Sequence, residues 1–396
     1  MYFAETNATF AAVESAAKLA PRGLSFGATV GWILALGFLG MGIEGYIPPA
    51  PKEPGTSVRI GLGTIREEGS AGGNLPGVAA WDVYGKRLGE AWGGKKIISN
   101  GSPVDILAVH YKGLGGALGQ YVAVTNGGND AICIAFMVVK WLEDNFAWIG
   151  DAGKECNADW YYSETIIRNS PTGQSFKPVC IWIDRDRSLG LRFQGFGMHI
   201  IDFDVREIGR QRQYTKYPET MCSRPRFHMY KDMKTEDDIY VFDPPLEYLP
   251  DGTDKDIRKV LVGGKLAGTL RKPWRKRDNY HIMPRAVPIT PREQKLRSKF
   301  LRDVLIVSGW PAHKAVQLCK SQTSAGPDLV SLSDGLFCDM ESKEVWPLCK
   351  NGTMTKHACF DVDTRRMKGG RIGARDRLSG RAIPAKAYAT VRNWGS

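Results

Sequence analysis

The chain has 396 residues, 43% of them hydrophobic and 10% aromatic, with 45 glycines and 22 prolines. This composition excludes a disordered chain, and the length allows two domains of ordinary size. The net charge of +12 is uneven: residues 251–396 hold 29 Lys and Arg against 14 Asp and Glu, whereas residues 1–250 hold 25 against 28. A basic C-terminal part is typical either of a solvated surface or of a segment that binds nucleic acid, anionic lipid or acidic polysaccharide.

The N-terminal region contains an uncharged apolar run, residues 26–43, which is 18 residues long. This is the short end of the length that a membrane-spanning helix requires, and its glycines are better tolerated in lipid than in water. Lys18 and Arg22 precede the run. The positive-inside rule then keeps residues 1–25 in the cytosol and predicts a signal anchor with the membrane as partner. A cleavable signal peptide is the alternative; either way, residues 46–396 are expected to be lumenal or extracellular.

A proline-rich spacer, residues 46–55, leads into a long region of short apolar runs separated by glycine clusters. This spacing over residues 56–250 predicts a mainly β, antiparallel, sandwich-like domain. The clearest strand patterns are Ala131–Val139, Val179–Ile183 and Met198–Phe203.

Residues 251–299 are polar and basic and are interpreted as a linker. The basic pair Lys276 and Arg277 within it is a candidate processing site, although a plain basic loop explains it equally well.

Residues 300–396 are predicted to form a small α+β module. Asp303–Ser308 has a strand pattern, and Ala382–Trp394 is expected to add a last strand. Pro311–Lys320 is expected to be a helix that begins at its proline. Three apolar side chains spaced along one face of it are expected to be buried, namely Ala312, Val316 and Cys319.

Eight cysteines fall into two groups of four, one on each side of the linker: Cys133, Cys156, Cys180 and Cys222, then Cys319, Cys338, Cys349 and Cys359. No CxxC pair is present, so zinc-ribbon and thioredoxin-like sites have no support. An even number behind a translocation signal predicts disulfides. If each group pairs internally, nine connectivities remain open. Two sequons, at Asn100 and Asn351, are candidate glycosylation sites and agree with the same compartment.

The words around the cysteines include GGNDAICIA, WIGDAGKECNADWYYS, KPVCIWID, HKAVQLCKSQTSAGPDLVS and GLFCDMESKEVWPLC. They resemble a group of uncharacterised secreted or membrane-anchored proteins of filamentous ascomycete fungi. The resemblance covers most of the chain after about residue 75. It implies a compartment and a fungal origin, but no catalytic residue, because the group has no established activity.

The carboxylates between the second and third strand patterns offer one candidate site. Neither a GxSxG nor an HExxH motif is present. Asp184, Asp186 and Asp202 with His199 form the candidate catalytic set of a hydrolase, provided that the two strands pair. The same aspartates with Asp204 form a candidate Ca²⁺ site, since Ca²⁺ prefers clustered oxygen ligands. Alternatively, the cluster is neutralised by nearby arginines: Arg185, Arg187 and Arg192.

Aromatic side chains crowd the first cysteine group: Trp148, Trp160, Tyr161, Tyr162 and Trp182. Exposed rings beside polar groups are a typical platform for sugars, whereas buried rings would pack against the disulfides.

The leading hypothesis is therefore a non-catalytic extracellular or cell-surface recognition protein, with cell-wall polysaccharide or a surface protein as partner. It needs no cofactor, apart from the alternative Ca²⁺ ion. A secreted hydrolase is one alternative. A binder of nucleic acid or anionic surfaces through residues 258–277 is another, although lumenal topology argues against nucleic acid.

Overall fold

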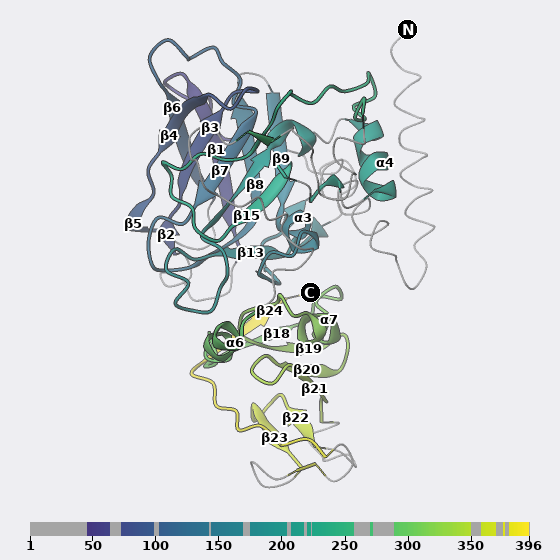
Figure 1. Cartoon of the computed structure of the whole chain (residues 1–396). Helices are drawn as coiled ribbons and strands as arrows, with labels where there is room; N and C mark the ends of the chain where they lie inside the picture. The colour runs from purple at the N-terminus through teal and green to yellow at the C-terminus, as the bar shows by residue number, and fades with distance from the viewer. Residues whose placement is uncertain are drawn as a thin grey trace.

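The computed structural model is mainly β, with a larger sheet above a smaller C-terminal part (Figure 1). The structure describes residues 46–63, 73–98, 103–141, 144–168, 175–203, 207–217, 220–222, 224–256, 270–271, 289–349, 358–369, 375–376 and 380–395.

The larger part is built from short strands that alternate with turns, as the glycine clusters require. Its strands are β1 (Gly55–Leu62), β2 (Asn74–Leu75), β3 (Gly77–Trp81), β4 (Arg87–Ala91), β5 (Gly94–Ile97), β6 (Val104–His110), β7 (Tyr121–Thr125), β8 (Ile132–Trp141), β9 (Asp144–Ile149), β10 (Trp160–Tyr161), β11 (Ile167–Arg168), β12 (Ser175–Phe176), β13 (Cys180–Ile183), β14 (Gly195–His199), β15 (Phe227–Tyr230), β16 (Val241–Phe242) and β17 (Leu270–Arg271). Its helices are α3 (Gly150–Glu155), the 3₁₀ helix η2 (Ile200–Phe203) and α4 (Ile208–Lys216).

One antiparallel sheet organises this part. Its strand order is β10-β13-β8-β1-β6-β4-β3-β7-β14-β15, with β9 pairing to β8 off this path. The long strand β8 reads ICIAFMVVKW, and its first eight residues are buried. A continuous apolar run of this kind is typical of a strand covered on both faces.

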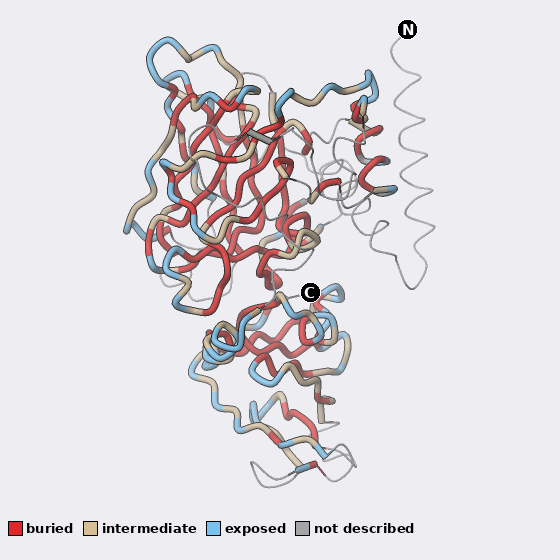
Figure 2. The backbone as a smooth tube through the Cα atoms, in the orientation of Figure 1, coloured by how far each residue is buried: buried red, intermediate tan, exposed pale blue. Residues whose placement is uncertain are grey.

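The sheet is curled, so that strands far apart in its order share one core. Trp148 on β9 stacks on Phe196 of β14 and Phe227 of β15, with ring centroids 5.2 and 5.7 Å apart. Figure 2 shows this core as a nearly continuous block of buried backbone.

The predicted strand Met198–Phe203 is only half correct. Strand β14 ends at His199, and the chain then turns into η2. Apolar residues continue from β14 into η2, so the run of apolar residues in the sequence did not mark where the strand ends.

The C-terminal part contains a five-stranded sheet of order β21-β20-β19-β18-β24. Its elements are α6 (Pro291–Arg297), β18 (Val304–Ser308), α7 (Ala315–Lys320), β19 (Asp328–Ser331), β20 (Leu336–Asp339), β21 (Glu344–Pro347), β22 (Cys359–Asp361), β23 (Arg366–Lys368) and β24 (Thr390–Trp394). Strand β18 is parallel to both β19 and β24, whereas the other pairs are antiparallel. The strands expected at 303–308 and 382–394 are therefore present, the latter as β24.

The helix expected at Pro311–Lys320 is shorter than predicted and buries a different face. It begins at Ala315 and buries Ala315, Leu318 and Cys319, while Ala312 is exposed. Just before this helix, His313 Nδ1 and Ser308 Oγ share a hydrogen bond of 2.8 Å. This bond holds residues 308–313 in a turn.

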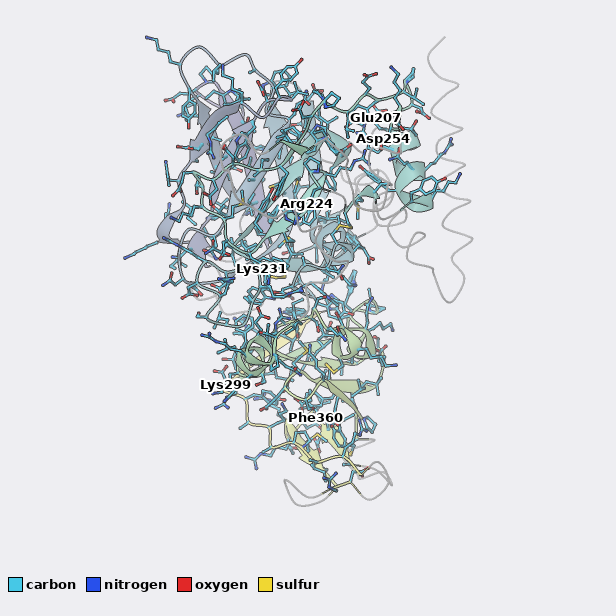
Figure 3. The ribbon with its side chains drawn as sticks, viewed as in Figure 1. Glu207, Arg224, Lys231, Asp254, Lys299 and Phe360 are labelled. Atoms are coloured by element: carbon cyan, nitrogen blue, oxygen red, sulfur yellow. A yellow bond between two sulfur atoms is a disulfide. The ribbon has the colours of Figure 1, made fainter. Side chains whose placement is uncertain are left out.

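Four disulfides are present, and each joins cysteines of the same group, as the four-and-four split suggested. The pairs are Cys133–Cys180, Cys156–Cys222, Cys319–Cys338 and Cys349–Cys359. Phe337 in the C-terminal sheet stacks on Phe360 of the β22–β23 hairpin at 4.1 Å. Figure 3 shows Phe360 in this lowest part of the molecule.

The predicted linker is folded at both ends. Residues 251–256 pack beside α4, where Figure 3 shows Asp254 close to Glu207. Residues 289–299 form α6, which begins with a capping box between Thr290 and Glu293. The linker prediction is therefore wrong for these ends, because local polarity does not report the ion pairs that they make.

Several predictions fall outside the described residues: the anchor at 26–43, the sequons at Asn100 and Asn351, and the basic pair Lys276 and Arg277. Within the described part of the chain, no helix has both the length and the apolar character that crossing a membrane needs. The spacer starts against the core, since Tyr46 meets Phe136 edge to face at 5.4 Å.

Candidate functional site

The five aromatic residues expected to form a sugar platform are buried. Each is no more than 3% exposed: Trp148, Trp160, Tyr161, Tyr162 and Trp182. None of them is accessible to a polymer, so the expectation of an exposed platform at these residues is wrong. Their sequence pattern, aromatic residues in β segments, is equally typical of a core.

Four of these rings instead join the two parts of the molecule. Tyr161 donates its hydroxyl hydrogen to the Pro327 carbonyl oxygen at 2.9 Å, and Trp182 donates its indole N–H to the Ala325 carbonyl oxygen at 2.7 Å. Both acceptors lie in the loop before β19. Buried Tyr and Trp side chains need such partners for their polar atoms, so the rings fix the C-terminal part against the larger sheet.

Tyr162 and Trp160 extend this joint. Tyr162 stacks on His313 with ring centroids 4.5 Å apart, and its hydroxyl group donates to Gln317 Oε1 at 2.8 Å. Trp160 donates its indole N–H to Ser321 Oγ at 3.0 Å. The role of the rings is therefore structural.

The structure separates Asp184 and Asp186 of the predicted carboxylate cluster from Asp202. Strand β13 pairs with β8 and β10, and β14 pairs with β7 and β15, so the two segments are not neighbours. The backbone N–H of Asp184 donates to the carbonyl oxygen of Phe193, which lies just before the start of β14. Asp202 lies just after the end of β14. A five-residue strand spans about 16 Å. Asp204 lies outside the described residues.

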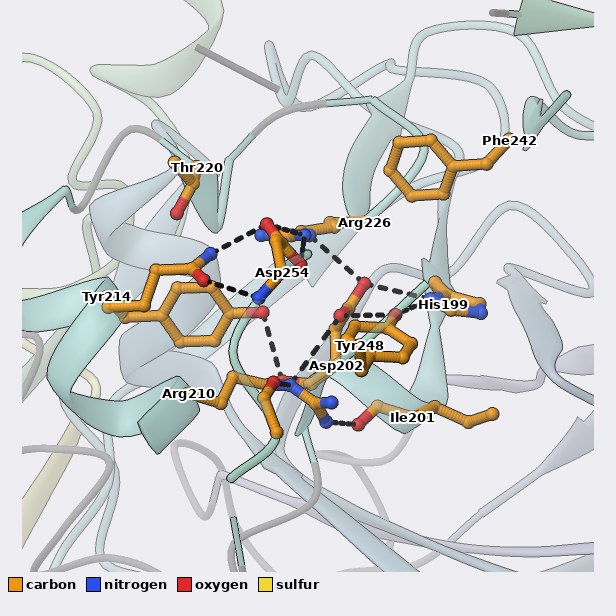
Figure 4. A network of polar contacts seen from close by, with 12 residues as sticks. His199, Ile201, Asp202, Arg210, Tyr214, Thr220, Arg226, Phe242, Tyr248 and Asp254 are labelled. Atoms are coloured by element: carbon orange, nitrogen blue, oxygen red, sulfur yellow. Dashed lines mark hydrogen bonds and ion pairs between the residues drawn. The ribbon is translucent and has the colours of Figure 1, made fainter. Parts of the chain in front are cut away.

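His199 and Asp202 do come together, at the end of β14 (Figure 4). His199 Nδ1 is 2.8 Å from Asp202 Oδ2, and His199 Nε2 is 3.3 Å from Gln120 Oε1. Both side chains are almost completely buried. In a hydrolase the second ring nitrogen would face a nucleophile or a water. Here it faces the amide oxygen of the half-buried Gln120, so the pair has the geometry of a structural contact.

Asp202 is the centre of a buried network of charges. Arg226 Nε lies 3.1 Å from Asp202 Oδ2, and the same guanidinium group contacts Asp254 at 2.5 Å. Tyr248 donates its hydroxyl hydrogen to Asp202 Oδ1 at 2.9 Å. Burial alone would raise the pKa of Asp202, but Arg226 and then His199 bring that pKa below its usual range. The network therefore holds an ionised carboxylate and ties the 248–254 segment to the sheet.

An exposed aromatic surface lies elsewhere, on strands that sequence reasoning did not single out. Among the described residues, five of the eight large hydrophobic side chains that are exposed fall between positions 84 and 111: Tyr84, Trp92, Ile97, Val109 and Tyr111. Trp92 is 61% and Tyr111 43% exposed. Single exposed apolar residues are normal, but a concentration of this kind is characteristic of an interaction surface.

Strands β4 and β6 bring three of these residues together. Val109 lies directly across from Glu90, Tyr111 follows two residues later, and Trp92 directly follows β4. Residues two apart on a strand point to one face, so Val109 and Tyr111 share the outer face of β6. We refer to Trp92, Val109 and Tyr111 as the β4–β6 face.

Polar groups border the β4–β6 face. Burial and the negative charge of Glu90, which accepts a hydrogen bond from the phenol, raise the pKa of Tyr111. Glu90 in turn accepts from Arg87 Nη1 at 2.7 Å. On the neighbouring strand, Arg59 makes two hydrogen bonds to Asp105, at 2.6 and 2.8 Å. The surface thus combines accessible rings with fixed donors and acceptors.

The sequence did not mark this face. In VDILAVHY, residues 104–111, apolar and polar residues do not alternate, and the exposed Val109 is apolar whereas the buried His110 is polar. Trp92 lies just outside a strand and has no periodic pattern to place it.

No protein-family model matches the chain, and no match was found among curated proteins or solved structures. Its class is therefore defined by its own fold: a mainly β protein with a curled antiparallel sheet and four disulfides.

Proposed function

We propose that the protein is a non-catalytic recognition protein of the cell exterior that binds wall polysaccharide through the β4–β6 face. The observation that carries this proposal is the concentration of exposed aromatic and aliphatic side chains at positions 84–111. The pyranose ring of a sugar has an apolar face of C–H groups that packs on an aromatic ring, and its hydroxyl groups need donors and acceptors at the edge. Trp92 and Tyr111 supply the rings, and Glu90 supplies an acceptor beside them.

The disulfides support an extracellular or lumenal compartment. All eight cysteines are paired, and disulfides persist in oxidising compartments. The sequence features at 26–43 support either an anchored or a secreted form. We interpret the scaffold as a sandwich-like β ectodomain with a small α+β module that is braced by two of the disulfides. Glycan at Asn100 or Asn351 in protein from a eukaryotic secretory host checks this compartment; unmodified protein with free thiols would contradict it.

Retention on insoluble chitin, cellulose and β-1,3-glucan tests the proposed function. We expect the full chain to be retained on at least one of them. Because an aromatic contact contributes about 0.5–1.5 kcal/mol, Trp92→Ala and Tyr111→Ala should each weaken retention about two- to tenfold. Leu249→Ala is the matched control, since Leu249 is also exposed but lies outside the β4–β6 face.

Two results would contradict the proposal. One is that no polysaccharide retains a protein whose circular dichroism shows the β fold intact. The other is that Leu249→Ala weakens retention as much as Trp92→Ala does, which would place binding elsewhere or make it nonspecific.

A further inference from the structure

The loop between β13 and β14 contains a carboxylate that the fold buries without a cationic partner. Asp184 is 0% exposed and makes no ion pair among the described residues; the backbone groups of Asp186 and Leu189 are the donors beside its carboxylate. Burying an ionised carboxylate without a partner costs several kcal/mol. Asp202, by contrast, is buried beside a cation, the guanidinium group of Arg226.

A second carboxylate lies beside the first. Burial raises the pKa of Asp184 to about 7. The adjacent carboxylate of Asp186 also raises this pKa, through its negative charge and through a hydrogen bond between the two side chains. Asp186 is exposed, and its Oδ1 accepts a hydrogen bond from the backbone N–H of Ser188 at 2.9 Å. The loop is therefore turned so that one buried and one accessible carboxylate are close together.

The sequence left open that nearby arginines neutralise this pair of carboxylates. In the structure they do not. Arg185 donates to the Gly127 carbonyl oxygen at 3.2 Å, and Arg187 pairs with Asp232 at 3.0 Å.

The third arginine is also committed elsewhere. Arg192 pairs with the fully buried Asp159 at 2.7 Å. With all three guanidinium groups directed to other partners, the negative charge of the Asp184 and Asp186 pair is left for a cation from solution.

We propose that Asp184 and Asp186 hold a Ca²⁺ ion at the loop between β13 and β14. The carboxylate oxygens of Asp184 keep lone pairs beyond the backbone hydrogen bonds from Asp186 and Leu189, and Asp186 retains one oxygen that Ser188 does not use. Water completes the shell on the side of Asp186, which is open to solvent.

The ion is Ca²⁺ rather than a transition metal because its ligands are hard oxygens. No group of three or more His, Cys, Asp or Glu in the described ranges is arranged to hold a metal. With only two carboxylates, the affinity belongs to the weak range of extracellular modules, a Kd of about 10⁻⁴–10⁻³ M.

Calorimetric titration of the full chain with CaCl2 after EDTA treatment tests the site, with the melting temperature as a second readout. We expect a Kd in that range and a melting temperature that rises with CaCl2 up to about 10 mM. Asp184→Asn and Asp186→Asn should each weaken binding by more than about tenfold and abolish the thermal shift. Asp363→Asn is the charge-matched control, because Asp363 is exposed in the β22–β23 hairpin of the C-terminal part, and it should leave the Kd unchanged.

The proposal is overturned if Ca²⁺ produces neither heat nor a thermal shift in the unmodified chain. It is equally overturned if both Asn variants bind Ca²⁺ as the unmodified chain does. Because Asp186 is exposed, Asp186→Asn is expected to fold even if Asp184→Asn does not, so the test remains decisive. None of these outcomes depends on the β4–β6 face, so this inference and the proposed function fail independently.

Discussion

Buried ionisable residues divide into those that the fold compensates and those that it leaves open. Asp202 belongs to the first kind, because it is in contact with His199, Arg226 and Tyr248. Asp184 belongs to the second. A hydrolase that used the two aspartates together would need them in one accessible cleft, and the structure gives neither proximity nor access. The catalytic alternative therefore has no geometric support at the residues that suggested it.

Asp202→Asn should destabilise the protein strongly. The change leaves Arg226 and Arg210 without their shared carboxylate in a buried site, and breaking a buried pair costs about 3–5 kcal/mol. Urea unfolding followed by circular dichroism measures this loss. Asp232→Asn, which breaks an exposed pair with Arg187, should cost no more than about 1 kcal/mol. Equal losses in the two variants would show that the Asp202 network contributes little.

At the scale of elements, the disulfides close loops of different length. Cys156–Cys222 spans 66 residues, whereas Cys349–Cys359 spans 10. The entropy that a crosslink removes from the unfolded chain grows with the logarithm of loop length. The longer loop should therefore contribute more to stability.

Replacing both cysteines of a pair by alanine tests this. Removing Cys156–Cys222 should lower the free energy of unfolding by about 4 kcal/mol, and removing Cys349–Cys359 by about 3 kcal/mol. The measurement is urea unfolding of the two double variants under identical conditions. A larger loss from the short loop would mean that native packing around Cys359, which is completely buried, outweighs loop entropy.

Strands were easier to predict from the sequence than their partners or their faces. Continuous apolar runs located β8, β13 and β18, because each is a short run rich in β-branched Ile and Val, which favours a buried strand over a helix. The sequence could not show that β14 pairs with β7 and β15, since strand pairing depends on contacts across long separations. For the same reason it could not distinguish Trp182 in a buried joint from Trp92 on an open face.

On the scale of the whole molecule, the two parts share the largest hydrophobic cluster. Buried apolar residues of the curled sheet and of the C-terminal part meet in it, among them Tyr161 and Leu318, while each part also has a smaller cluster of its own. A charged contact crosses the same boundary: Asp159 forms ion pairs with Arg192, at 2.7 Å, and with Arg297 of α6, at 2.5 Å. The two parts are therefore expected to unfold together, since neither can expose this boundary without losing both kinds of contact.

This shared core makes a prediction about a cut chain. A protease site introduced between positions 277 and 278 leaves one cysteine group on each side, and no disulfide joins the two groups. The buried joint of Tyr161, Trp182 and Asp159 should nevertheless hold the two pieces together. After cleavage, size-exclusion chromatography should show one species of the intact mass, 43.8 kDa, while denaturing electrophoresis without reductant should show two bands. Asp159→Asn in the same background should weaken the association, because it removes the carboxylate that Arg297 contacts. Pieces that separate under native conditions would mean that chain continuity, rather than the shared core, keeps the two parts in place.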